Sequence, residues 1–251
     1  MWTWIHKFSS PKYFYDMSAK LIPWFAIPAL VIGVYGLYLG LFVAPTDYQQ
    51  GESYRIIFIH VPAAWMSLFI YMVMAVSAGV GLIWQIRLAD VVAAASAPIG
   101  ASFTFLALVT GSLWGKPMWG TYWVWDARLT SELILLFLYF GYMALQSSIE
   151  DQRQADKASG LLAIVGVVNI PIIHYSVEWW NTLHQGATVA KFDKPSMHID
   201  MLIPLLLMAL AFKLFYAAVV LIRARNEALY RDRNRRWVRE LIEKNMNGEK
   251  I

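Results

Sequence analysis

Cysteine is absent from this chain, and charged residues are scarce. Without cysteine there are no disulfides, no thiolate metal ligands and no C-x-x-C-H pattern for covalent haem attachment, so any cofactor must be held by other atoms. Only 15% of the residues are charged whereas 59% are hydrophobic, which is too apolar for one soluble domain. The phosphate-binding pattern G-x-x-x-x-G-K-[ST] is also missing, so any ATP chemistry must belong to a partner.

What the chain has instead is a set of long apolar runs. Each is close to the roughly 20 residues that cross the hydrocarbon core of a bilayer. They cover residues 21–43, 61–86, 91–113, 133–149, 161–177 and 201–222. The first is too long for the apolar core of a cleaved signal peptide, which favours a retained anchor. We therefore expect an all-α polytopic membrane protein with six transmembrane helices, forming a single domain over residues 1–251.

The distribution of lysine and arginine predicts the orientation in the membrane. If both termini are cytoplasmic, fifteen of these residues lie in inner segments and five in outer loops. This bias follows the positive-inside rule. Residues 223–251 then form a basic cytoplasmic tail, expected to be a helix against anionic lipid or against a partner subunit. The tryptophan-rich stretch at 114–132 faces the other compartment.

Four of the five histidines fall on this predicted outer side. They are His60, His174, His184 and His198. His60 precedes Pro62, and proline favours the first turn of a helix, where the positive end of the helix dipole disfavours an imidazolium. A neutral imidazole with a free ring nitrogen is what a metal requires. The alternative for each histidine is an interfacial side chain satisfied by water or a carbonyl.

The outer stretch "WGKPMWGTYWVWDARLTSE" concentrates indole rings in a short segment. It contains Trp114, Trp119, Trp123 and Trp125. An ordinary aromatic belt at the membrane interface is one explanation. The interleaved Gly115 and Gly120 favour another, in which a planar ligand approaches the backbone closely. A second stretch, "EWWNTLHQG", brings further indole beside His184.

A broad apolar ligand with anionic groups and a metal would suit these residues, and haem has all three properties. Arg55 and Arg128 are the two outer arginines, and a guanidinium can bind a propionate through two hydrogen bonds. The alternatives are anchorage to lipid headgroups for either arginine, or a local pair of Arg128 with Asp126. Asp126 itself is expected to orient the loop or a group on a partner.

The pattern W-G-x-x-x-W-G-x-x-W-x-W-D resembles the tryptophan-rich WWD signature of haem-handling membrane proteins. With six spans and short loops, essentially the whole chain resembles the CcmC family of the cytochrome c maturation system. The resemblance implies that haem b is held non-covalently on the periplasmic side, between the WWD segment and two axial histidines that map onto His60 and His184. From the residues alone, His174 stays an alternative second ligand.

The resemblance also implies partners and a location. The expected partners are a membrane-anchored haem chaperone like CcmE, transporter subunits like CcmA and CcmB, and a small single-span subunit like CcmD, with no nucleic acid. The location is the bacterial inner membrane. The implied role is haem delivery, with promotion of covalent attachment to the chaperone, rather than catalysis on a small substrate.

Two other functions compete with this interpretation. A transporter or exporter that moves haem across the membrane would place polar groups and broken helices near the midplane. A membrane b-type cytochrome would pair histidines inside facing spans, and no such pair occurs in the predicted spans.

Overall fold

The computed structural model describes residues 10–184, 186, 189 and 194–246, and its regular elements there are all helices. In chain order they are α2 (Pro11–Tyr38) with its π-helical end η1 (Leu39–Val43), the 3-10 helix η2 (Glu52–Ile56), α3 (Ile57–Trp84), α4 (Arg87–Trp119), α5 (Ala127–Ser148), α6 (Gln152–Gly166), α7 (Asn169–Trp179), α8 (Ile199–Arg231) and α9 (Arg236–Met246).

Six of these segments are long and apolar enough to cross a membrane, which confirms the all-α polytopic fold. Helices α6 and α7 together make one of the six, Gln152–Trp179, and are separated by a break at Val167 and Val168. Across this break, the Asn169 side-chain amide donates to the Ser131 carbonyl of α5 at 2.8 Å. The backbone N–H groups of Val167 and Val168 donate to carbonyls three residues earlier, so the break leaves these groups paired.

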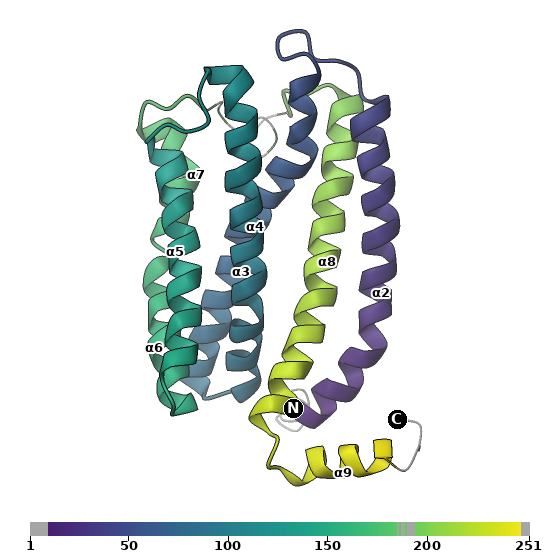
Figure 1. Cartoon of the computed structure of the whole chain (residues 1–251), viewed down its shortest axis with the longest axis vertical. Helices are drawn as coiled ribbons and strands as arrows, with labels where there is room; N and C mark the ends of the chain where they lie inside the picture. The colour runs from purple at the N-terminus through teal and green to yellow at the C-terminus, as the bar shows by residue number, and fades with distance from the viewer. Residues whose placement is uncertain (1–9, 185, 187–188, 190–193, 247–251) are drawn as a thin grey trace.

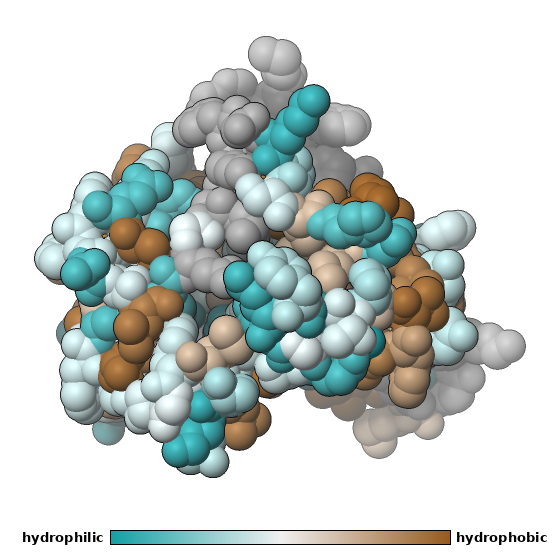
Figure 2. All heavy atoms as spheres, turned by 90° about the horizontal axis from the view of Figure 1, so that it is seen from above, coloured by the Kyte–Doolittle hydropathy of each residue, from teal (hydrophilic) through white to brown (hydrophobic). Residues whose placement is uncertain are grey.

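The helices run up and down, so their connections gather at two ends (Figure 1). We call the end that carries the α4–α5 and α7–α8 connections the Trp-rich end, and the end that carries α9 and the α5–α6 turn the basic end. Figure 2 looks onto the Trp-rich end, where apolar and polar residues are interspersed. At the opposite end α9 lies across the bundle.

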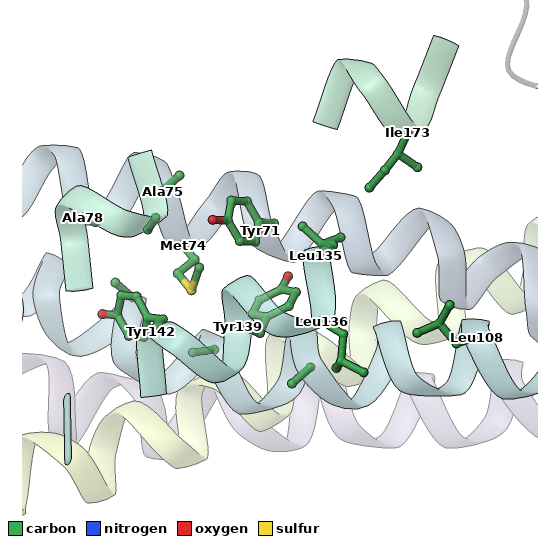
Figure 3. Packing of buried hydrophobic residues seen from close by; sticks show 14 of the residues in the cluster. Tyr71, Met74, Ala75, Ala78, Leu108, Leu135, Leu136, Tyr139, Tyr142 and Ile173 are labelled. Carbon is green, nitrogen blue, oxygen red and sulfur yellow. The ribbon is translucent and has the colours of Figure 1, made fainter. Parts of the chain in front are cut away.

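The core of the bundle lies between α3, α4, α5 and α6 (Figure 3). Tyr71 of α3 and Tyr139 of α5 pack edge to face, with ring centroids 5.1 Å apart. The Tyr139 hydroxyl donates to the Ser67 carbonyl at 2.8 Å, so this buried polar group has a partner. Helix α2 packs mainly against α8, at one side of this core.

Helix α4 continues beyond the apolar run predicted at 91–113 and ends only at Trp119. Gly120 follows it with φ 78°, the left-handed conformation in which glycine commonly ends a helix. Helix α5 begins at Ala127 after the N-cap Asp126. The 114–132 segment therefore consists of the end of α4, a short link and the first turns of α5, and helices position most of its residues.

The start of α3 is fixed by a close contact with the end of α2. A side chain at Gly40 would place its Cβ 2.6 Å from the Phe58 ring, so only glycine allows this approach. Arg55 donates to the Gly40 carbonyl at 2.8 Å and also bonds Glu52. These contacts hold the first turn of α3, which contains His60. Pro62 lies in the second turn, because α3 begins at Ile57.

Candidate functional site

His60 is half-buried in the first turn of α3 and faces α4. Its Nδ1 lies 3.0 Å from the Ala107 carbonyl oxygen and 3.0 Å from the Thr110 hydroxyl oxygen. A carbonyl can only accept, and the Thr110 hydroxyl already donates to the Leu106 carbonyl at 2.6 Å. Nδ1 must therefore carry the proton, which leaves Nε2 of the neutral ring with a free lone pair.

Gly111 makes room for this imidazole. A Cβ added at Gly111 would lie 2.9 Å from Cε1 of His60, which is closer than real Cβ contacts come. Trp114, one turn further along α4, packs its indole against the same imidazole with ring centroids 5.7 Å apart. The Trp114 Nε1 donates to the Gln50 side chain at 3.0 Å. Helix α4 thus supplies acceptor, space and an aromatic wall for His60.

His184 is held in a similar way at the other side of the Trp-rich segment. Its Nδ1 lies 3.0 Å from Oδ2 of Asp126, and its ring packs against Trp119 with centroids 4.7 Å apart. The other carboxylate oxygen of Asp126 accepts the Leu129 backbone N–H at 2.8 Å and so caps α5. Asp126 therefore ties His184 to the start of a membrane helix. A carboxylate on Nδ1 again leaves Nε2 available.

The environment of His184 favours its neutral form. Burial lowers the pKa of His184 below its ordinary value of 6.5, and the positive charge of Arg128 acts in the same direction. The charge and hydrogen bond of Asp126 oppose this effect without outweighing it. At neutral pH the ring is therefore uncharged, with Nδ1–H donating to Asp126.

The four tryptophans of the segment occupy different environments. Trp114 and Trp119 are half-buried beside the two histidines. Trp123 packs against the main core, and its indole N–H is buried with no partner in the described part of the chain. Trp125 is 76% exposed and packs edge to face on Trp123. Two indoles thus contact imidazoles, one carries a buried unsatisfied donor, and one faces outward.

The two outer arginines also differ. Arg128, near the start of α5, lies close enough to both His60 and His184 to act on them electrostatically. Arg55 is engaged by Glu52 and the Gly40 carbonyl, neither of which belongs to the Trp-rich segment. The structure therefore brings Arg128 to the two histidines and gives Arg55 local partners.

The two remaining outer histidines lie apart from this group. His174 is exposed on α7 and packs against Tyr175. His198 is exposed, caps α8 and pairs with Asp200. Within the described residues, no three or more His, Asp or Glu side chains gather as a metal cluster. Two axial imidazoles complete the coordination of an iron whose other four ligands come from a porphyrin, so the donor set fits haem.

Comparison with known proteins places the chain in one family. The family model CcmC, "Heme exporter protein C", matches residues 4–239. The chain is 52% identical to heme exporter protein C of Haemophilus influenzae over 97% of its own length and 99% of the relative's. It is 54% identical to that of Escherichia coli K12, over 96% and 98% of the two chains. The chain belongs to the CcmC family.

A mitochondrial protein is also similar to this chain. A ccmC-like mitochondrial protein of cytochrome c biosynthesis from Marchantia polymorpha is 53% identical over 70% of this chain and 74% of its own. The family membership predicted from the WWD pattern is thus confirmed.

Sequence reasoning missed some partners of the site in this CcmC family member. Ala107, Thr110 and Gly111 surround His60 but lie within an apolar run and look like ordinary span residues. Thr110 beside Gly111 was no distinctive signal, because the same run also contains Ser96, Ser102, Thr104 and Ser112. Asp126 was expected to orient the loop or a partner, and the structure adds a specific contact with His184.

Proposed function

We propose that this membrane protein holds haem b non-covalently at the Trp-rich end, with His60 and His184 as its two axial ligands. The observation that carries the proposal is that the two imidazoles have the same arrangement of hydrogen bonds. Each has Nδ1 on a fixed acceptor, Ala107 or Asp126, and each keeps Nε2 available. Such outer partners set the tautomer and the ring orientation that iron requires.

The surrounding residues support a flat, anionic ligand. Trp114 and Trp119 flank the histidines and offer apolar faces, while Trp123 and Trp125 extend the aromatic surface. The buried indole N–H of Trp123 is a donor that a carboxylate oxygen of the ligand would satisfy. Arg128 is the stronger propionate candidate because it lies near both histidines, and Arg55 is the weaker one because it has local partners.

We propose further that the haem is passed to a membrane-anchored chaperone during c-type cytochrome biogenesis. The relatives are named for haem export and cytochrome c biosynthesis, which supports membership in a haem-exporting complex. The expected partners are a CcmE-like chaperone, CcmA- and CcmB-like transporter subunits and a CcmD-like single-span subunit. The membrane is the bacterial inner membrane, with the Trp-rich end periplasmic and the basic end cytoplasmic.

A second candidate is movement of haem across the membrane by this chain. The break between α6 and α7 favours it, because broken helices mark binding sites in transporters. The break lies beside Tyr71, whose buried hydroxyl has no partner among the described residues. Replacing Asn169 with Leu would remove the polar contact across the break. It would impair transport, and leave haem held at the Trp-rich end unaffected.

The test uses the full chain, purified in detergent and loaded with haem. His60→Gly and His184→Gly should each lose the bis-histidine absorption spectrum, because iron loses one axial ligand. Added imidazole should fill the open position and restore the spectrum together with part of the haem. Rescue by imidazole also shows that the variant has folded.

Matched controls come from the other outer histidines. His174→Gly and His198→Gly should keep the spectrum, since both side chains are exposed and neither has a ring contact with Trp114 or Trp119. If His174→Gly loses the spectrum and His184→Gly keeps it, the ligand assignment is wrong. A second assay measures transfer of haem to the chaperone, and a wild-type chain that retains haem but never transfers it would contradict the delivery role.

A further inference from the structure

The basic end contains a pocket of about 490 Å³ between the end of α3, the start of α4, α6 and the turn from α8 to α9. Its lining is predominantly positive. The basic lining residues are Arg87, Arg153, Lys157, Arg231, Arg233 and Arg235, and the acidic ones are Asp90, Glu150 and Asp156. These cations come from three separate parts of the chain, so the fold gathers them into one concave site.

Two ion pairs form the framework of this pocket. Arg231 binds both carboxylate oxygens of Asp156, at 3.0 and 3.1 Å, and both side chains are largely buried. Arg87 holds Asp232 at 2.6 Å, and Asp232 also accepts the Trp237 indole N–H at 3.0 Å. The first pair joins α6 to α8, and the second joins α4 to the α8–α9 turn. The charges in these pairs are neutralised within the protein.

Four other basic residues of the lining have no ion-pair partner among the described residues. Of these, Arg233 donates to the Tyr230 carbonyl, which is neutral. Arg153 and Lys157 lie one turn apart on α6, and Arg235 lies in the α8–α9 turn. All three are exposed, and in the described part of the chain none of their side chains has a hydrogen-bond or ion-pair partner. They leave the pocket with a surplus of positive charge, which an anionic ligand would balance.

We propose that this pocket binds a phosphate group, carried by an anionic phospholipid of the membrane leaflet at the basic end. Basic pockets between membrane helices on the cytoplasmic side bind acidic headgroups. The apolar neighbours of the pocket suit the rest of a lipid. Ile83 and Trp84 lie between the lining residues Leu82 and Gln85 and are 70% and 65% exposed, so an acyl chain can lie against them.

Helix α9 supports the same location for the pocket. It lies across the basic end, with Val238 buried and Trp237 packed on Tyr15 of α2, while Arg236 and Arg239 are exposed (Figure 1). A helix with this division of side chains lies in the plane of a membrane interface. The pocket therefore opens at the depth of the lipid headgroups. Free inorganic phosphate is the other source of the same chemistry.

The experiment measures binding of short-chain dihexanoyl phosphatidylglycerol to the full chain in a neutral detergent. The wild type should bind it saturably and unfold at a higher temperature. The variant Arg153→Gln/Lys157→Gln/Arg235→Gln should bind about 100-fold more weakly, about fivefold for each lost cation. Haem retention of this variant should be unchanged, which shows that it is folded.

The matched control is Lys20→Gln/Arg239→Gln/Lys244→Gln. It removes the same charge from exposed residues of the basic end that do not line the pocket. Its affinity should stay within about twofold of the wild type. An equal loss in the control, or no saturable binding by the wild type, would overturn the proposal.

Dihexanoyl phosphatidylcholine and inorganic phosphate are the further probes. If dihexanoyl phosphatidylglycerol binds more tightly than inorganic phosphate, the site is assigned to lipid. If only inorganic phosphate binds, the assignment to lipid is overturned.

Discussion

The two ends of this bundle differ in the kinds of side chain that form their candidate sites. At the Trp-rich end, two imidazoles are held by hydrogen bonds and packed against indoles, and Arg128 lies close to both of them. At the basic end, two ion pairs join α6 to α8 and α4 to the α8–α9 turn, and further basic residues of the pocket have no ion-pair partner in the part of the chain that the structure describes. The first site is organised by ring geometry around two neutral imidazoles, whereas charge dominates the second.

This difference predicts different responses to salt and to mutation. The screening length is about 10 Å at 0.1 M salt and shortens as salt rises, so interactions between exposed charges weaken, whereas coordination bonds are little affected. Anion binding at the basic end should therefore fall as salt rises, while haem binding should hardly change. Variants at one end should leave the function of the other end intact.

The largest effect is expected for Arg231→Ala. Its side chain and that of Asp156 are 7% and 13% exposed, so the variant leaves a buried carboxylate without its partner. Breaking such a pair costs about 3–5 kcal/mol. The free energy of unfolding, measured by denaturant titration in detergent, should fall by this amount. Arg233→Ala changes an exposed residue of the same pocket and should cost less than about 1 kcal/mol. Similar losses in both variants would contradict the framework role of Arg231.

A smaller effect is expected for Asp126→Asn, which separates two roles of one residue. Asparagine caps helices about as well as aspartate, so the start of α5 should be preserved. The charge on the partner of His184 is lost, and the loss of such an outer partner typically lowers metal affinity about 10- to 100-fold. Haem affinity at pH 7, measured by absorption titration, should fall by this factor. Wild-type affinity in the variant would show that the contact with Asp126 is unimportant.

The same variant, Asp126→Asn, should also change the pKa of His184. Iron binds the neutral ring, and burial lowers the pKa of His184 below 6.5, so wild-type ligation should persist as the pH falls below 6.5 and fail only near the lowered pKa. The carboxylate of Asp126 raises the pKa of His184, so its removal lowers that pKa further. In the haem-free chain, the pKa of His184, measured by NMR titration, should therefore be lower in Asp126→Asn than in the wild type. A higher pKa in the variant would contradict this electrostatic account.

The smallest effect is expected for Gly111→Ala. The new Cβ would come within 2.9 Å of the His60 ring and push it from its position against Ala107. Because a side chain can shift by a few tenths of an ångström, we expect a loss of about 1 kcal/mol, or about fivefold in haem affinity. Gly79→Ala is the control, since its nearest neighbour is 3.9 Å away. Equal haem affinities of the two variants would show that the His60 ring accommodates a Cβ at position 111.

Features that depend on short stretches of sequence could be predicted, and contacts between distant helices could not. Six apolar runs predicted six spans, because lipid selects for local hydropathy. The end of α4 was not predicted, since hydropathy reports contact with lipid and the helix continues past it to Trp119. The contact of His184 with Asp126 joins residues 58 positions apart, and that of His60 with Ala107 joins residues 47 apart. The basic pocket was missed for the same reason.

The pairing of α2 with α8 has a consequence for the order in which the protein is made. Among the described membrane helices, α2 is synthesised first and α8, its main packing partner, is synthesised last. One face of α2, around Gly33 and Gly36, packs on Ala211 and Met208 of α8. During translation this face lies in the bilayer without that partner until α8 has been synthesised. Contacts between the two ends of a chain form late. A chain truncated before Ile199 therefore leaves its first anchor without this partner, exposed to cellular quality control.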